Sequence, residues 1–134
     1  LINSMSSKTM FKHADAIITV DARGFIFGTG ISLKLKKPLI LARKPGKLPG
    51  ELYEKKYNLE YGSNSLSIQK NSISPFQKFV IVDDLLATGG TVKCVDEIIK
   101  NAGKKVEGLS VVVELNELKA REQFSFPVFS EVSF

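Results

Sequence analysis

Residues 78–91 read Lys78-Phe79-Val80-Ile81-Val82-Asp83-Asp84-Leu85-Leu86-Ala87-Thr88-Gly89-Gly90-Thr91, and this stretch decides the fold. Its uninterrupted apolar run predicts a buried strand over 78–83 that stops at two aspartates. Apolar residues then recur on one face of a helix expected to begin at Thr91, with Gly103 as its C-terminal cap. A buried strand, a glycine turn and a helix therefore follow one another.

The segment 16–42 repeats this alternation. A β-branched run at 16–20 predicts a strand, 25–35 a helix broken before Pro38, and 39–42 a second strand. Strand, helix and strand in this order favour a right-handed unit in a parallel sheet. The other expected elements are a loop over 43–52, a hairpin of 57–61 and 66–70 around a turn at 62–65, a turn over 71–77, a strand over 106–115, a short helix within 116–122 and an edge strand over 126–132.

The chain has 134 residues, which predicts a single α/β domain over 1–134, with 43–70 as a mobile loop and hairpin inside it. Hydrophobic residues make up 43% and no apolar run reaches the roughly 20 residues that cross a bilayer, so no membrane partner is expected. One cysteine, Cys94, and one histidine, His13, exclude a disulfide framework and zinc sites built on several of these residues. This composition fits a reducing, cytoplasmic location.

The net charge of +5 comes from one segment. Residues 34–56 hold eight Lys or Arg against two Glu, while the rest of the chain sums to −1. A basic balance is typical of proteins that bind nucleic acid, membrane surfaces or phosphate-bearing ligands. One segment therefore carries the whole charge imbalance, and we expect no nucleic-acid partner.

The turn after the 78–83 strand has the chemistry of a phosphate site. Ligands bind at the carboxyl ends of strands in open α/β sheets. Gly89 and Gly90 permit positive φ, so backbone N–H groups and the helix dipole can meet an anion, and Thr88 and Thr91 add hydroxyl donors. Asp83 and Asp84 accept hydrogen bonds and suit a vicinal diol. Ribose 5-phosphate carries both groups, although a plain corner with helix-capping aspartates explains the same residues without a ligand.

The run from Val80 to Thr91 resembles the phosphoribosyl-diphosphate signature of the type I phosphoribosyltransferases. Segments 21–28, 43–50 and 59–62 resemble other parts of the same family, in the same order and at similar spacing. The Leu-Leu-Ala-Thr-Gly-Gly-Thr version is similar to that of the adenine-using members. The resemblance implies transfer of a phosphoribosyl group from phosphoribosyl diphosphate to adenine, giving AMP and pyrophosphate in purine salvage.

The resemblance also implies roles for individual residues. Arg23, Asp83 and Asp84 would act in catalysis, together with Glu60, which would interact with N7 of the purine as N9 attacks. The turn at Asp21-Ala22-Arg23 would bind pyrophosphate, often through a non-proline cis peptide in this family. The other substrate-binding residues would be Arg43, Lys44, Lys47, Tyr61, Leu85, Ala87, Thr88, Gly89, Gly90 and Thr91. Magnesium would bind through substrate oxygens and water, with no dedicated protein site.

The same resemblance implies a homodimer, with Arg43 reaching the neighbouring site. The family has an N-terminal hood over the base that this sequence lacks, so we expect an N-terminally incomplete domain. Three alternatives stay open: a non-catalytic nucleotide-binding or regulatory module, a transferase for another purine base, and an inactive fragment of an active enzyme.

Overall fold

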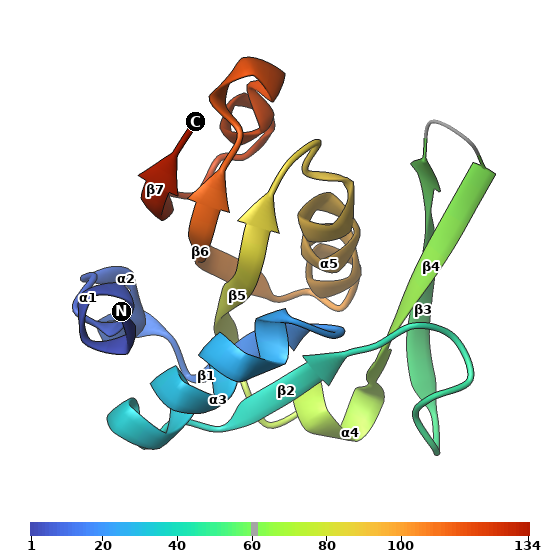
Figure 1. The fold of residues 1–134 in the computed structure, drawn as a ribbon. Coiled ribbons are helices and arrows are strands. Elements are labelled where there is room, and N and C mark those ends of the chain that lie inside the picture. The colour runs from blue at the N-terminus through green and yellow to red at the C-terminus, as the bar shows by residue number, and fades with distance from the viewer. Residues whose placement is uncertain (60–61) are drawn as a thin grey trace.

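The computed structural model describes residues 1–59 and 62–134 and is built on a central parallel sheet (Figure 1). Five strands lie in the order β2-β1-β5-β6-β7, and every neighbouring pair is parallel. The expected α/β class is confirmed. The strands are β1 (Ala16–Val20), β2 (Leu39–Ala42), β5 (Lys78–Leu86), β6 (Lys105–Glu114) and β7 (Val128–Ser133).

Helices cover both faces of this sheet (Figure 1). On one face lie α1 (Ile2–Ser6), α2 (Met10–His13) and α3 (Gly24–Leu35), and on the other α5 (Gly90–Asn101). The short helix α4 (Lys70–Ile73) occupies part of the expected 71–77 turn, and two 3₁₀ helices, η1 (Asn116–Leu118) and η2 (Ala120–Gln123), form most of the segment expected as one short helix. No helix among the described residues is long and apolar enough to span a bilayer.

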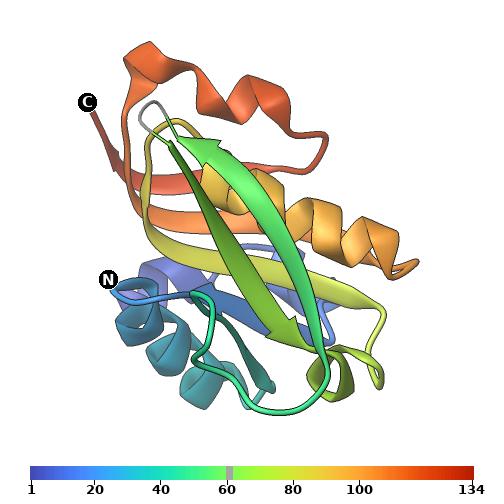
Figure 2. The same ribbon diagram turned by 90° about the vertical axis from the view of Figure 1, so that its right-hand side faces the viewer.

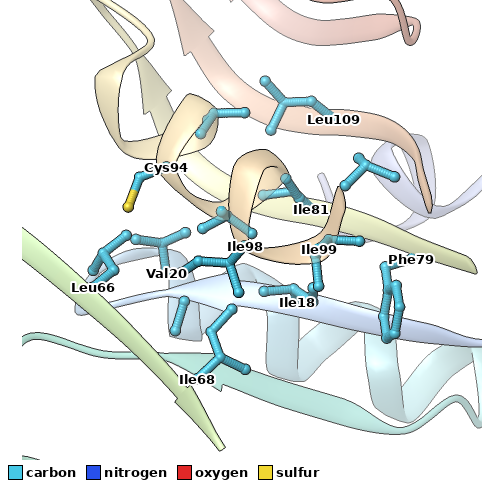
Figure 3. Close-up of a cluster of buried hydrophobic side chains, with 14 of the residues drawn as sticks. Ile18, Val20, Leu66, Ile68, Phe79, Ile81, Cys94, Ile98, Ile99 and Leu109 are labelled. Carbon is cyan, nitrogen blue, oxygen red and sulfur yellow. The ribbon is translucent and has the colours of Figure 1, made fainter. Parts of the chain in front are cut away.

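The larger hydrophobic core lies between the sheet, α5 and the hairpin (Figure 3). Ile18 and Ile81 come from the sheet, Ile98 from α5 and Ile68 from the hairpin, and each is at most 3% exposed. The apolar face expected for the 91–102 helix is therefore the one that packs. Burying an aliphatic side chain of this size stabilises the fold by about 1.5–3 kcal/mol relative to leaving it in water.

The opposite core fixes how close α3 comes to β1. A Cβ built on Gly28 would lie 2.6 Å from Thr19 Cβ, so only glycine allows this approach. Ile31 is fully buried there, whereas Ile26 and Leu33 are 70% and 75% exposed. The expected helix over 25–35 is confirmed, and these two apolar residues are exposed because they lie on the side of α3 that no other described element covers.

The hairpin is longer than the sequence predicts. Strands β3 (Leu52–Leu59) and β4 (Gly62–Gln69) pair in antiparallel register from Leu52–Gln69 to Leu59–Gly62 and extend beside α5 (Figure 2). The segment 62–65 is thus strand, not turn, because its polar residues pair with 56–59 of β3. The Cys94 thiol is buried and donates to Lys55 O at 3.3 Å, which ties β3 to α5. Burial raises the pKa of this thiol to about 11, as expected for a structural cysteine.

Strand β5 continues past the point where the sequence predicts its end. Asp83, Asp84 and Leu85 all lie in the strand, which pairs with β6 as far as Leu86–Glu114. The sequence predicts that the strand ends at the aspartates because charged groups disfavour a buried strand. The electrostatic environments of the two carboxyl groups allow both aspartates to lie within β5.

Candidate functional site

A pocket of about 340 Å³ opens at the carboxyl ends of β1 and β5. Its size is typical of a site for a small ligand. It lies at the edge of the sheet where the sequence places a ligand. Thirteen of its lining residues come from three stretches, Val20–Arg23, Asp83–Gly89 and Thr91–Val92, with Lys44, Tyr57 and Leu66 completing the wall.

The turn between β5 and α5 has the geometry expected of an anion site. Gly89 has φ +86°, a left-handed conformation that glycine adopts without strain. In the described part of the chain, the backbone N–H groups of Ala87, Thr88 and Gly89 have no hydrogen-bond acceptor. Free N–H groups at the start of a twelve-residue helix can bind a phosphate, with the helix dipole adding partial positive charge. Gly90, the first residue of α5, is outside the pocket lining.

The two aspartates sit in different electrostatic environments. Asp83 is 8% exposed, and burial, with neighbouring Asp84, raises its pKa to about 7. The Arg23 guanidinium holds the pKa of Asp84 below its ordinary value, although partial burial acts in the opposite direction. One carboxyl group therefore titrates near neutral pH, while the other stays ionised. This explains how both fit within a strand.

Arg23 brings the turn after β1 to the end of β5. Its Nε donates to Asp84 Oδ2 at 2.5 Å, although the two residues are 61 positions apart. The side chain is 74% exposed, and its two terminal nitrogens have no partner among the residues the structure describes. They are available for a second anion. The peptide bond Asp21–Ala22 is cis, as the family resemblance implies.

The basic loop contributes fewer residues to the pocket than the sequence predicts. Lys44 lines the pocket, and its backbone N–H lies 3.4 Å from Asp21 Oδ2. Arg43 Nε donates to the same oxygen at 3.3 Å, and its guanidinium stacks over Phe25 at 5.7 Å from the ring centroid. Lys47 is exposed and, like Arg43, is outside the lining. The charge that faces the pocket from this loop is therefore that of Lys44.

An apolar hollow of about 430 Å³ adjoins the site on the other side of Leu85. Leu85 lines both the pocket and this hollow, together with Arg23 and Asp84 at the border. The rest of the wall is apolar, formed by Ile26, Phe27, Val112 and Val113. A flat aromatic ligand placed here would lie next to Arg23 and Asp84, which also line the neighbouring pocket.

Glu60 and Tyr61 lie outside the described residues, so their predicted roles stay predictions. Across 1–59 and 62–134, no three His, Cys, Asp or Glu side chains gather as a metal centre. Asp84 is already paired with Arg23, and Asp83 is mostly neutral below pH 7. These donors suit a magnesium ion held mainly by substrate oxygens and water, because Mg²⁺ retains several waters.

Sequence reasoning missed two groups near the site. Tyr57 lines the pocket from β3, and Gln123 in η2 donates to Thr88 O at 2.8 Å. Neither position has a composition or spacing signal. Their contribution comes from tertiary contacts alone, and the loop–helix motif does not contain them.

The model of the phosphoribosyl transferase domain family matches residues 1–132, and the chain belongs to that family. Its relatives narrow the comparison. A protein of Prochlorococcus marinus (strain MIT 9211) named adenine phosphoribosyltransferase is 63% identical over all 134 residues, which correspond to 78% of its length. The protein of that name from Mycoplasmopsis pulmonis is 48% identical over 113 residues, 84% of this chain and 66% of its own.

Solved structures of proteins with the same name also resemble this chain. The adenine phosphoribosyltransferase of Thermoanaerobacter pseudethanolicus superposes with a TM-score of 0.86 at 34% identity, covering 99% of this chain and 80% of that one. The Saccharomyces cerevisiae enzyme, crystallised with an imino-altritol bisphosphate and adenine, has a TM-score of 0.85 at 33% identity, covering 98% and 80%.

Proposed function

We propose that this protein transfers the 5-phosphoribosyl group of phosphoribosyl diphosphate to adenine, releasing AMP and pyrophosphate for purine salvage. The single observation that carries the proposal is the pocket at the edge of the sheet. There a turn with free N–H groups, two aspartates with different pKa values and an exposed arginine meet. A phosphate, a ribose diol and a pyrophosphate are the ligands that these three groups suit.

The phosphoribosyl group binds through the end of β5. The 5-phosphate accepts hydrogen bonds from the N–H groups of residues 87–89 and from the hydroxyls of Thr88 and Thr91. Asp84, and Asp83 when ionised, accept hydrogen bonds from the ribose hydroxyls. These contacts hold the anomeric carbon in a fixed position, which lowers the entropic part of the barrier.

The leaving group binds at the turn after β1. As the bond from C1′ to the pyrophosphate oxygen breaks, positive charge develops on the ribose and negative charge on the departing oxygen. The free nitrogens of Arg23 and the Lys44 ammonium stabilise that oxygen. Bound magnesium would supply further charge neutralisation to the pyrophosphate. Arg43 and Lys47 belong to the same basic loop and strengthen the field around it.

The base binds beside Leu85. The apolar hollow and Leu85 accept the flat face of adenine, which places N9 next to the anomeric carbon. The bond from N9 to C1′ forms as pyrophosphate leaves, and the N9 proton is released. Glu60 interacts with N7 during this step and Tyr61 lies near the substrate, both on the strength of the family resemblance.

The protein is proposed to act as a homodimer in the cytoplasm. The dimer is proposed from the family resemblance, and Leu33 on α3 is 75% exposed, so packing of a second copy of the chain against this helix would remove its apolar side chain from water. The cytoplasmic location is proposed from the single, unpaired cysteine. Sedimentation velocity of the wild type and of Leu33→Glu tests the dimer: a monomeric wild type would contradict it.

The proposed reaction is tested by incubating the protein with phosphoribosyl diphosphate and Mg²⁺. Adenine, hypoxanthine, guanine, xanthine or orotate is added in turn, and the nucleotide formed is measured. AMP formed from adenine alone is the expected result. If another base is converted to its nucleotide and adenine is not, that base and not adenine is the acceptor. Binding of phosphoribosyl diphosphate without turnover of any base would point to a nucleotide-binding module or to an incomplete enzyme.

A further inference from the structure

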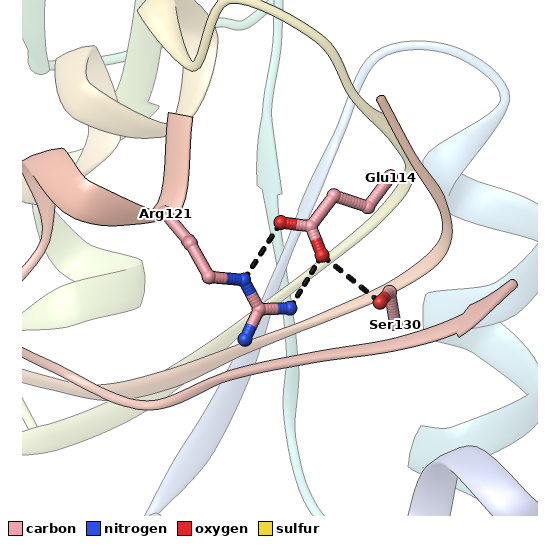
Figure 4. A network of polar contacts seen from close by, with 3 residues as sticks. All are labelled: Glu114, Arg121 and Ser130. Atoms are coloured by element: carbon pink, nitrogen blue, oxygen red, sulfur yellow. Dashed lines mark hydrogen bonds and ion pairs between the residues drawn. The ribbon is translucent and has the colours of Figure 1, made fainter. Parts of the chain in front are cut away.

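An ion pair between a buried glutamate and a half-exposed arginine anchors η2 to the end of the sheet (Figure 4). Glu114 is the last residue of β6, and its side chain is 3% exposed. Arg121 binds both carboxylate oxygens, with Nε 2.8 Å from Oε2 and Nη2 on Oε1, and Ser130 Oγ donates to Oε1 at 3.0 Å. A bidentate pair with an additional donor fixes orientation as well as charge. Arg121 therefore holds η2 in one orientation against β6 and β7.

The far end of η2 contacts the turn between β5 and α5. Gln123 Nε2 donates to Thr88 O at 2.8 Å. A Cβ built on Gly89 would lie 3.1 Å from this nitrogen and 3.3 Å from both Ala120 Cβ and Phe124 Cζ. The turn thus packs directly against η2 and the residue that follows it. Ala120 is 1% exposed, so the contact is well packed at its centre.

The contact to Thr88 O has a consequence for the neighbouring N–H group. In a trans peptide unit the carbonyl of one residue and the N–H of the next point in opposite directions. When Gln123 binds the carbonyl of Thr88, the N–H of Gly89 is turned away from η2. Gly89 also lines the pocket, so an N–H that is turned away from η2 is available to an anion bound there.

We propose that Gln123 is a positioning residue for the phosphate-binding turn and that the Arg121–Glu114 pair holds Gln123 in place. The proposal rests on the function proposed above, since it concerns the phosphate of the same substrate. Gln123 touches no reacting atom. It orders one peptide unit before the phosphate arrives, so that less ordering is required on binding.

The test compares Gln123→Met with Glu122→Met. Methionine keeps the length of Gln123 but removes the donor to Thr88 O, while Glu122 is exposed on the same turn and serves as the matched control. Ribose 5-phosphate binding is measured by titration calorimetry, and the KM values for phosphoribosyl diphosphate and adenine are measured separately. Loss of one neutral hydrogen bond should weaken ribose 5-phosphate binding and raise the KM for phosphoribosyl diphosphate by about three- to tenfold. The KM for adenine and the midpoint of thermal unfolding should stay unchanged.

Two further variants separate positioning from plain stabilisation. Arg121→Met should raise the KM for phosphoribosyl diphosphate in the same selective way, and it should also lower the unfolding midpoint because it leaves the buried Glu114 carboxylate without its ion-pair partner. Arg121→Lys, which keeps the charge, should restore part of the affinity. Equal changes in both KM values, or a change in the unfolding midpoint alone, would overturn the proposal. Wild-type protein that binds ribose 5-phosphate without using adenine would refute the proposed reaction and leave this inference standing. Wild-type protein that does not bind ribose 5-phosphate would refute the inference itself.

Discussion

The turn after β1 and the turn after β5 lie at the same edge of the sheet, but they present positive charge in different ways. At residues 21–23 the charge is on a side chain, the Arg23 guanidinium, which is 74% exposed and fixed by one contact to Asp84. At residues 87–91 the charge is the partial charge of backbone N–H groups at the start of α5, and the turn is packed against η2. Backbone N–H groups need exact conformation, whereas an exposed guanidinium can adjust. The two turns should therefore differ in how they respond to substitution and to salt.

The largest effect is expected at Gly89. Valine there would have to adopt φ near +86° and would place its Cβ within 3.3 Å of Ala120 and Phe124, so the turn must change shape. Gly89→Val should abolish phosphoribosyl diphosphate binding measured by titration calorimetry. Gly103→Val is the control, since Gly103 has φ +77° with nothing within 4 Å of its Cβ position. It should lower the free energy of unfolding by about 1–3 kcal/mol and leave binding intact. Normal binding by Gly89→Val would show that the turn does not hold the phosphate.

The next largest effect is expected at Asp84, the residue that joins the two turns. The Asp84 carboxylate pairs with Arg23, and we propose that it also binds the ribose hydroxyls. Asp84→Asn removes the negative charge that both contacts use. Hydrogen bonds to charged groups contribute about 1.5–3 kcal/mol, so kcat/KM for phosphoribosyl diphosphate should fall about 10- to 150-fold. Asp15→Asn is a matched control at the opposite end of β1. The Asp15 carboxylate accepts from the backbone N–H groups of Gln77 and Lys78, which lower its pKa. That variant should change stability and leave kcat/KM unaltered.

Asp83 should make both stability and binding depend on pH. Its pKa rises from 3.8 to about 7 on folding, so between these values the folded state holds a proton that the unfolded state has lost. The free energy of unfolding should therefore fall as pH rises from about 4 to 7 and level off above that range. Asp84, whose pKa is lowered, contributes in the opposite sense, with stability lost only as pH falls below about 4. Urea unfolding at several pH values gives the free energy of unfolding of the wild type and of Asp83→Asn. The difference between the two slopes of this free energy against pH measures the contribution of Asp83.

Ligand binding should show the reverse sign at Asp83. The ionised carboxylate accepts stronger hydrogen bonds through both of its oxygens than the protonated group does, so phosphoribosyl diphosphate should bind more tightly as pH rises through 7. Calorimetry in buffers of different ionisation enthalpy should detect release of a proton on binding. Binding without proton release at pH 6.5 would mean that Asp83 is already ionised or does not take part.

The smallest effects are expected at the exposed cations. Arg23→Met should raise the KM for phosphoribosyl diphosphate by about tenfold at low salt, and the ratio to wild type should shrink at 0.5 M salt because exposed charges are screened. Lys44→Met should show a smaller change of the same kind. Lys47→Met is the comparison for distance: Lys47 is exposed and outside the pocket lining, so its loss should change the KM less than the loss of Lys44. Gly89→Ala, by contrast, should show an effect that does not depend on salt. A Lys47 effect as large as that of Lys44 would mean that the loop changes position when substrate binds.

The sequence predicts most of the sheet because its strands are short apolar runs, and β1 and β2 have the predicted bounds. Reasoning failed where a polar residue is stabilised by a distant partner. Asp84 lies within β5 because Arg23, 61 positions earlier, pairs with it, and the polar residues of 62–65 lie in a strand because they pair with 56–59. The position of the turn between β5 and α5 could be predicted from its glycines, and its phosphate-binding role stays a proposal. Gln123 could not, because a glutamine in a polar segment carries no local signal until the fold brings it to Thr88.

The parallel pairing of β1 with β5 also bears on how the chain folds. Ile17 pairs with Val80, so the strands at the centre of the sheet meet only after more than sixty intervening residues have been looped out. Strands β3 and β4 lie inside that loop, and their paired residues are at most 17 positions apart in the sequence. Because closing a long loop costs chain entropy before any contact compensates for it, such non-local pairings slow folding. We expect the hairpin strands to meet before the sheet forms, and docking of β5 between β1 and β6 to limit the folding rate.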